Sequence, residues 1–196
     1  LLCSARVGAE RKLKGINFIG TLKTLGKQHG GEVRERVEKR LQGDFGESVR
    51  HGALLASGWY PAGWYGRLLD AIVSETRGDA GSVRQLSRAA VAADFKTLFK
   101  VVRLFMTPQN ALQQSMRVSR RYIDGGEIDV VEAGDGHIHY RFREYHGYTR
   151  LMWWDFIGGI EGVLSNLGAE DMTARVITGG EDGDSHMEVV LRWRDR

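Results

Sequence analysis

The fold is decided by residues 122–193, and within them first by EIDVVE (127–132), AGDG (133–136) and HIHYRFR (137–143). Apolar side chains alternate with polar ones on both sides of the AGDG loop, which is the pattern of strands with one buried face. Glycine and aspartate in the loop tolerate positive φ and favour a hairpin. The sequence therefore predicts two antiparallel strands, with Tyr140 among the residues that face the interior.

A strongly apolar helix follows this hairpin. Apolar residues recur at steps of three and four from Trp153 to Leu167, and Gly168 is suited to end the helix. Residues 172–177 and 187–193 then alternate again, around the glycine- and acid-rich loop GGEDGD (179–184). Two hairpins joined by a helix predict a small antiparallel sheet with one buried face, in an α+β protein whose helices come first.

The N-terminal half has helical periodicity. We expect helices over residues 15–122, including a long buried one near 82–106 and a proline-started one over 108–121. Residues 1–14 are polar and basic, which indicates a flexible lead-in. The predicted organisation is one domain, 15–196, with a helical part (15–122) and a ββαββ part (123–196).

Composition narrows the class of protein. The 196 residues carry a net charge of +3 and a single cysteine, which excludes an internal disulfide and a zinc site built on several thiolates. No apolar run is long enough for a membrane helix, and no secretory signal is visible. We therefore expect a cytoplasmic protein with no membrane segment.

Several short motifs resemble a paralogous family of uncharacterised myxobacterial proteins. The likeness extends from Lys14 to Trp193, and the family implies no established activity. The motifs that carry it are Gly15 to Leu25, Ser57-Gly58-Trp59-Tyr60-Pro61 with Trp64-Tyr65, Arg121-Tyr122 with Gly125-Gly126, and Gly179-Gly180 before the final strand.

The order of elements is more distantly similar to small-molecule-binding domains related to 4-vinyl reductases, to haem nitric-oxide-binding domains and to a vesicle-tethering family. This resemblance implies a ligand pocket between helices and sheet, and dimerisation through the helical part. The haem-binding relatives use a tyrosine-serine-arginine signature and a helical histidine. Residues 140–144 (YRFRE) lack the serine, and residues 82–121 contain no histidine, so we predict that haem is unlikely and that no cofactor is bound.

Motifs for other chemistry are weak or missing. His137, His139 and His186 are a weak alternative as metal ligands, because arginines share their strand faces and oppose a cation. No nucleophile elbow, P-loop or dinucleotide fingerprint occurs. Nucleic-acid binding is not favoured either, since most aromatics that would stack on bases fall on the apolar side of the alternation.

The apolar side of the sheet is therefore the predicted place for function. Large rings beside glycines line apolar pockets, and they also fill ordinary cores. We expect a non-enzymatic sensory or regulatory module that binds a small apolar or aromatic ligand and can form a homodimer. The alternatives are a protein-interaction or dimerisation module without a ligand, and an enzyme of unknown class. The candidate pocket residues are Trp64, Tyr140, Trp153, Trp154, Phe156 and Gly158.

Overall fold

The computed structural model describes residues 11–98 and 120–195. In chain order its elements are β1 (Lys12–Lys14), α1 (Gly15–His29), α2 (Gly31–Arg40), α3 (Gly43–Arg50), β2 (Trp59–Pro61), α4 (Ala62–Thr76), α5 (Ala80–Leu98), β3 (Ile123–Asp124), β4 (Glu127–Gly134), β5 (His137–Arg143), α8 (Arg150–Asn166), β6 (Ala169–Gly179) and β7 (Met187–Asp195). The predicted α+β class, with helices before a ββαββ unit, is confirmed.

The main sheet has four antiparallel strands in the order β4-β5-β7-β6. Its register pairs Tyr140 with Val189 and Phe142 with Met187, and all four of these side chains are buried. The next residue along β5, Arg141, is exposed. The alternation read from the sequence therefore places one face of the sheet in the core and leaves the other polar.

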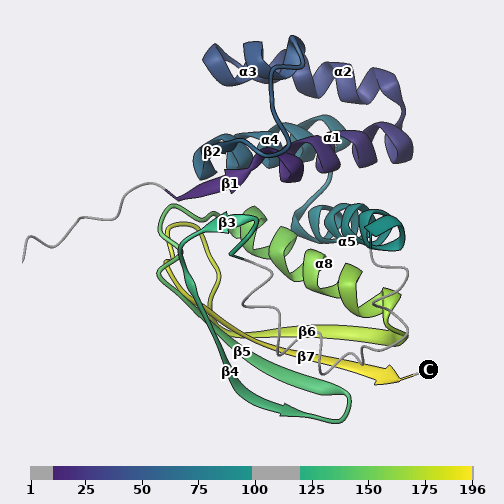
Figure 1. Cartoon of the computed structure of the whole chain (residues 1–196), viewed down its shortest axis with the longest axis vertical. Coiled ribbons are helices and arrows are strands. Elements are labelled where there is room, and N and C mark those ends of the chain that lie inside the picture. The colour runs from purple at the N-terminus through teal and green to yellow at the C-terminus, as the bar shows by residue number, and fades with distance from the viewer. Residues whose placement is uncertain (1–10, 99–119, 196) are drawn as a thin grey trace, which may run out of the picture.

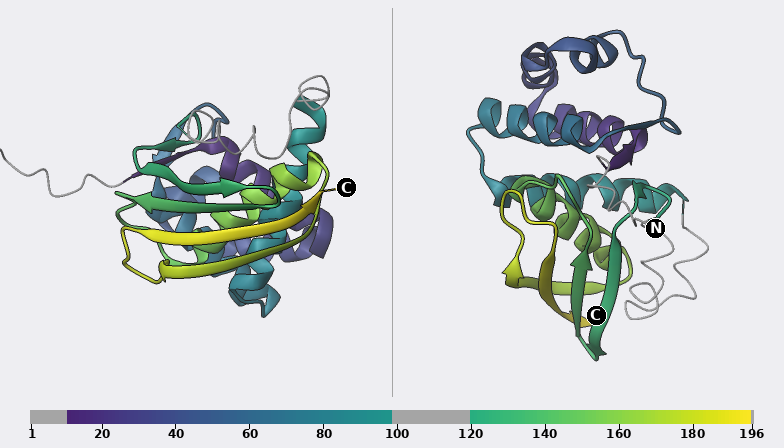
Figure 2. Two further views of the ribbon diagram at one scale, coloured as in Figure 1. Left: turned by 90° about the horizontal axis from the view of Figure 1, so that it is seen from below. Right: turned by 90° about the vertical axis from the view of Figure 1, so that its left-hand side faces the viewer.

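Helix α8 covers the apolar face of this sheet (Figure 1). It begins at Arg150, and the side-chain oxygen of its N-cap residue, Thr149, accepts a hydrogen bond from the Met152 backbone N–H. Gly168, with a φ of 102°, follows the helix and turns the chain into β6. Helix α5 packs along the side of α8 that faces away from the sheet, so α8 lies between two layers (Figure 2).

The remaining helices form a layer above α5 and α8. Helices α1 and α4 lie side by side, and α2 and α3 pack beyond them (Figure 1). Phe18, Leu25 and Leu68 are fully buried and belong to the same hydrophobic core as the sheet residues. The helical part and the sheet part therefore share one continuous core.

Two features differ from the sequence prediction. Lys12–Lys14, placed in the lead-in, form β1, which pairs with both β2 and β3 in a second sheet of order β2-β1-β3. Strands of two or three residues carry too few positions for periodicity to reveal them. Helix α5 begins at Ala80, and the predicted helices beyond Leu98 lie outside the described residues. The division into a lead-in and one domain stays a prediction.

Within residues 11–98 and 120–195, no helix combines the length and the apolar character that a membrane crossing requires.

Candidate functional site

The six predicted pocket residues fall into three separate places. Tyr140, Trp153 and Phe156 meet between α8 and the sheet. Trp154 and Gly158 lie on the side of α8 that faces α5. Trp64, on α4, stacks between Phe45 and Tyr60 in the helical part, with ring centroids 5.0 Å and 5.8 Å away. One pocket lined by all six is therefore not formed, and a ligand role for any of them stays a prediction.

The sheet-side group belongs to a larger set of rings, which we call the aromatic layer. Phe142 is at its centre, with the Phe156 ring centroid 5.0 Å away and that of Tyr140 5.5 Å away. Trp153 contacts Tyr148 at 4.9 Å and Tyr145 at 5.4 Å between centroids. The layer consists of Tyr140, Phe142, Tyr145, Tyr148, Trp153 and Phe156.

Trp153 is the unusual member of the aromatic layer. Its side chain is completely buried, yet its indole N–H has no hydrogen-bond partner among the described residues. Leaving a buried donor unpaired costs about 1–3 kcal/mol, and native proteins rarely tolerate it without a reason. A buried, unpaired donor among aromatic rings is the kind of group that a ligand acceptor satisfies.

The opposite side of α8 is in very close contact with α5. A Cβ atom on Gly158 would lie 2.2 Å from the Arg84 carbonyl oxygen, and one on Gly162 would lie 2.7 Å from that of Arg88. These glycines therefore permit the two helix backbones to approach each other closely. Arg84 also binds the buried carboxylate of Glu161 through two nitrogens and lies over the Trp154 ring, 5.5 Å from its centroid.

A chain of hydrogen bonds, which we call the polar chain, connects four helices in this region. The Tyr65 hydroxyl on α4 donates to Asp155 Oδ1 on α8 at 3.0 Å. Because that hydroxyl has one hydrogen, Thr21 on α1 is the donor in the 2.8 Å contact between the Thr21 and Tyr65 oxygens. The Ser87 side chain on α5 is hydrogen-bonded to Asp155 as well. Thr21, Tyr65 and Ser87 are all buried.

Asp155 is the titratable centre of the polar chain. Desolvation by burial raises the pKa of its carboxyl from 3.8 to about 7, although the hydrogen bonds from Tyr65 and Ser87 act in the opposite direction. Burial, and then the nearby Asp155 charge, hold the pKa of the Tyr65 phenol well above its ordinary value. Sequence reasoning missed Asp155, because a single acid on an otherwise apolar helix gives no motif.

The three histidines weighed as metal ligands are not brought together. His139 on β5 is opposite Val190 on β7, four residues from His186 and so about 13 Å along the strand. His139 Nε2 lies 3.0 Å from Glu188 Oε2, and His137 Nε2 lies 3.4 Å from Glu132 Oε1. In residues 11–98 and 120–195, no group of three histidine, cysteine, aspartate or glutamate side chains has metal-binding geometry.

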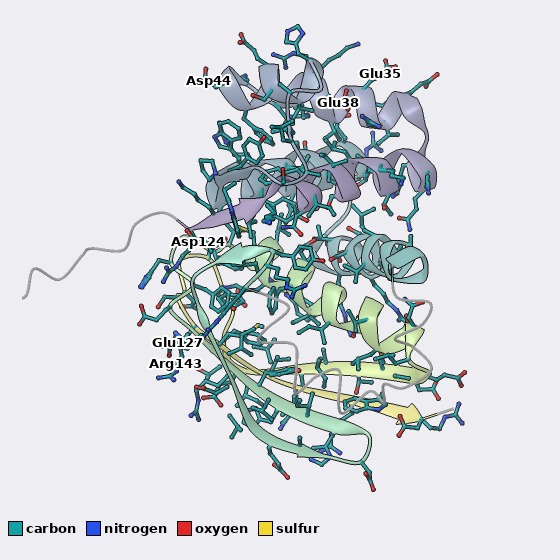
Figure 3. The ribbon with its side chains drawn as sticks, in the orientation of Figure 1. Glu35, Glu38, Asp44, Asp124, Glu127 and Arg143 are labelled. Carbon is teal, nitrogen blue, oxygen red and sulfur yellow. The ribbon has the colours of Figure 1, made fainter. Side chains whose placement is uncertain are left out.

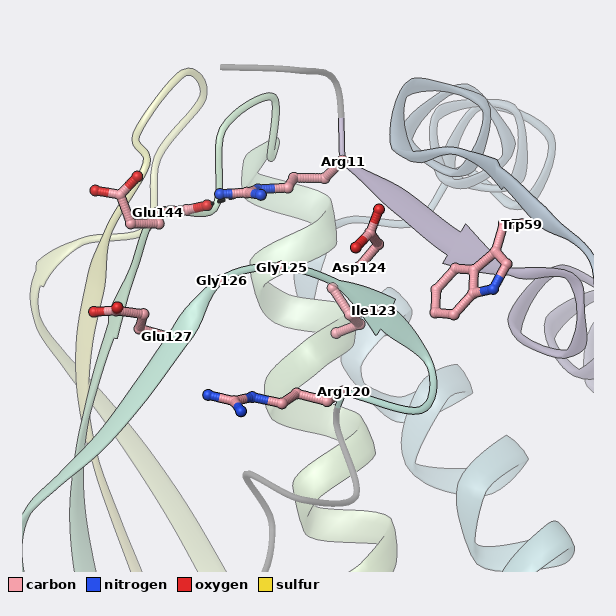
Figure 4. Close-up of a pocket in the computed structure, with 9 residues that line it drawn as sticks. All are labelled: Arg11, Trp59, Arg120, Ile123, Asp124, Gly125, Gly126, Glu127 and Glu144. Atoms are coloured by element: carbon pink, nitrogen blue, oxygen red, sulfur yellow. Dashed lines mark hydrogen bonds between the residues drawn. The ribbon is translucent and has the colours of Figure 1, made fainter. Parts of the chain in front are cut away.

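A cleft of about 450 Å³ opens where the small sheet meets the main one (Figure 4). Arg11 reaches across it and donates a 2.9 Å hydrogen bond to the Glu144 carbonyl oxygen. Gly126, with a φ of 83°, lies so close to the Tyr145 ring that a Cβ atom would be 2.5 Å from it. The lining residues are Arg11, Trp59, Arg120, Ile123, Asp124, Gly125, Gly126, Glu127 and Glu144. Gly125-Gly126 and Trp59 belong to the motifs of the resemblance to a myxobacterial family, but the sequence did not predict this cleft.

Solved structures of H-NOX proteins, the haem nitric-oxide-binding family, share this fold. An Fe(II) unliganded H-NOX mutant from K. algicida superimposes with a TM-score of 0.71 at 12% identity, covering 94% of this chain and 98% of its own. An Fe(II) H-NOX mutant from S. oneidensis gives 0.70 at 15% identity, with the same coverage. An oxygen-binding H-NOX domain related to soluble guanylate cyclases gives 0.65 at 18% identity and covers 93% of this chain and 96% of its own.

At sequence identities of 12–18%, the similarity to these H-NOX structures establishes the fold alone. No protein-family model matches the chain, and no curated protein matches it in sequence. The predicted likeness to a myxobacterial paralogous family therefore has no support, whereas the more distant likeness to haem nitric-oxide-binding domains is confirmed as a likeness of fold.

The prediction that haem is unlikely is contradicted by this comparison. The structures that share this fold include H-NOX proteins, the haem nitric-oxide-binding family, and a further structure that concerns haem redox potential and porphyrin distortion. The sequence prediction rested on the absence of the tyrosine-serine-arginine signature and of a helical histidine. Their absence excludes one way of binding haem and leaves other iron ligands open. None of the six histidines is buried, and the sequence has none between His51 and His137. An iron ligand in the interior would therefore be another residue type.

Proposed function

We propose that this chain is a non-enzymatic sensory module that binds a small molecule in the interior, between α8 and the sheet. The observation that carries the proposal is the fully buried indole N–H of Trp153, which has no hydrogen-bond partner in the described part of the chain and lies in the aromatic layer of an H-NOX-like fold. A mostly apolar and aromatic lining with a small number of polar groups is the usual composition of a small-molecule site. The rings of the layer are in contact, so a ligand enters by displacing them.

Helix α8 connects the proposed binding site to the helical part of the protein. Trp153 and Phe156 lie against the aromatic layer, whereas Asp155 in the same turn belongs to the polar chain that reaches α1, α4 and α5. A ligand that moves the rings must move the first turns of α8, and with them the Asp155 carboxyl. Sensing requires two states that a ligand stabilises differently, and the polar chain gives α8 contacts that change between such states.

Haem is the first cofactor to test. The described residues that would hold it are the rings of the aromatic layer, which supply apolar contact, and three buried phenols in that layer, since tyrosine oxygen ligates haem iron in some proteins. Bound haem would supply an iron able to take a diatomic ligand. The candidate iron ligands are Tyr140, Tyr145 and Tyr148.

The test is titration of the full chain with haemin, followed by the Soret absorption and by quenching of tryptophan fluorescence. We expect one haemin per chain and a Soret band distinct from that of free haemin. The substitution Trp153→Phe keeps a ring in the layer but removes the N–H group, and should weaken binding while the fold persists. Trp59→Phe is the matched control, because Trp59 is 41% exposed and outside the layer.

Either of two results contradicts the proposal. The first is a haemin spectrum unchanged by the protein. The second is a Trp153→Phe variant that binds haemin as tightly as the parent chain, which would show that the indole N–H serves no ligand in the interior. In that case the aromatic layer is an ordinary core. The predicted homodimer and the cytoplasmic location stay predictions, to be tested by light scattering and cell fractionation.

A further inference from the structure

The cleft between the two sheets has a charge pattern that the interior site does not explain. Two guanidinium groups, Arg11 and Arg120, line it, together with the carboxylate of Asp124 and the half-exposed indole of Trp59. We propose that this cleft binds a small zwitterion of the α-amino acid type, with its carboxylate on the arginines and its ammonium on Asp124 and Trp59. The proposal concerns a second site and does not depend on the interior one.

The other acids of the cleft already have partners. Glu127 pairs with Arg143 at 3.1 Å, and Glu144 has His146 Nε2 at 3.1 Å from its carboxylate. Asp124 and Arg120 have no hydrogen bond or ion pair within residues 11–98 and 120–195, and both are exposed. Of the charges that line the cleft, the two guanidinium groups and one carboxylate are thus available to a ligand.

In Figure 4 the two arginines lie on either side of Gly125 and Gly126, with their side chains directed the same way. Each lies near enough to the buried Tyr145 hydroxyl to lower the pKa of the phenol, against the larger effect of burial, which raises it. Arg11 donates its Nε hydrogen to the Glu144 carbonyl oxygen, and its guanidinium lies against Gly125. This hydrogen bond does not use the two terminal nitrogens of Arg11, which can therefore bind a ligand. Guanidinium groups held in this way bind a carboxylate through paired, charge-assisted hydrogen bonds.

The part of the cleft formed by Asp124 and Trp59 can bind a cation. Figure 4 shows the Asp124 carboxylate between Arg11 and the Trp59 ring in that view. One face of the Trp59 ring already accepts the Lys14 ammonium, 5.2 Å from its centroid. An ammonium group gains from both a carboxylate and an indole face. A cleft of about 450 Å³ falls within the range of small-ligand sites and accommodates an amino acid with a ring.

Calorimetric titration of the full chain with three matched probes tests the assignment. L-Phenylalanine carries both charges, 3-phenylpropionate only the carboxylate, and 2-phenylethylamine only the ammonium. We expect L-phenylalanine to bind tightest, by about 10-fold or more, since each charged hydrogen bond changes affinity by about 10- to 100-fold. Trp153→Phe should leave all three affinities unchanged, which separates this site from the interior one.

Two variants assign the ends of the ligand. Arg120→Ala should weaken L-phenylalanine and 3-phenylpropionate but not 2-phenylethylamine, and Asp124→Asn should weaken L-phenylalanine and 2-phenylethylamine but not 3-phenylpropionate. Both residues are exposed, so neither change should unfold the chain. Asp44→Asn and Arg192→Ala are the matched controls; Asp44 is exposed on α3, in a different part of the molecule from Asp124 (Figure 3).

Three outcomes overturn the proposal. They are the absence of heat with L-phenylalanine at millimolar concentration, equal loss of binding in the control variants, and 3-phenylpropionate binding as tightly as L-phenylalanine with no effect of Asp124→Asn. The last would define a site for plain carboxylates.

Discussion

Replacing Asp155 by asparagine should stabilise this protein at pH 8 and leave its stability unchanged at pH 4. In the folded chain the pKa of this carboxyl is about 7, against an ordinary value of 3.8. Between these two pH values the folded state keeps a proton that the unfolded state has released. The free energy of unfolding therefore falls as pH rises from about 4 to about 7, and the penalty is constant above that window.

The pKa and the burial of Asp155 determine how large the difference in unfolding free energy should be. The interval between 3.8 and about 7, at about 1.4 kcal/mol for each pH unit, gives an upper limit of about 4 kcal/mol. Asp155 keeps part of its surface exposed, so solvent screens part of the penalty and we expect about 1–3 kcal/mol at pH 8. Asparagine preserves an oxygen that accepts the Tyr65 hydrogen bond and adds an N–H donor toward Ser87, so the polar chain survives the substitution.

The assay is urea denaturation at intervals from pH 4 to pH 8, followed by tryptophan fluorescence. The difference in unfolding free energy between Asp155→Asn and the parent chain isolates this residue from the other groups that titrate. Asp44→Asn, on an exposed carboxylate, should show no such pH-dependent difference. A variant that is less stable than the parent at pH 8, or a difference that does not change with pH, would refute the reasoning.

The remaining predictions concern contacts of α8. Gly158→Ala should destabilise the fold by about 2 kcal/mol or more, because its Cβ would lie 2.2 Å from the Arg84 carbonyl oxygen. Gly159→Ala is its control: the nearest atoms to that Cβ are 3.7 Å away, so helix propensity should make the change neutral or stabilising by up to about 1 kcal/mol in thermal unfolding. Glu161→Gln should destabilise by about 2 kcal/mol, because the arginine it pairs with is mostly buried, and high salt should not abolish the difference. Tyr65→Phe removes a donor to Asp155, so the pKa of that carboxyl should rise further and the fall in stability should extend to higher pH; an unchanged pH profile would contradict this.

The outer face of the sheet is a place where sequence and structure agree closely. The alternation in 137–143 places Tyr140 inside and Arg141 outside, and the register confirms both. What the sequence left open was the pairing of charges on the polar face. Glu188 accepts hydrogen bonds from Arg141 and His139, and the pKa of its carboxyl is lowered, chiefly by Arg141. That pairing gives Arg141 and His139 an acidic partner on the same face of the sheet.

The order and type of the longer elements follow from the amino-acid sequence. Periods of two and of three to four residues depend on neighbours along the chain, so they identified the four strands of the main sheet and the apolar face of α8. Tertiary structure alone decided which distant residues meet. The separation of Trp64 from Trp153, the contact of Tyr65 with Asp155 across 90 positions, and the cleft between the two sheets all depend on strand order and helix packing. Local periodicity carries no information about either, because many packings bury the same apolar faces, and only the folded chain selects one.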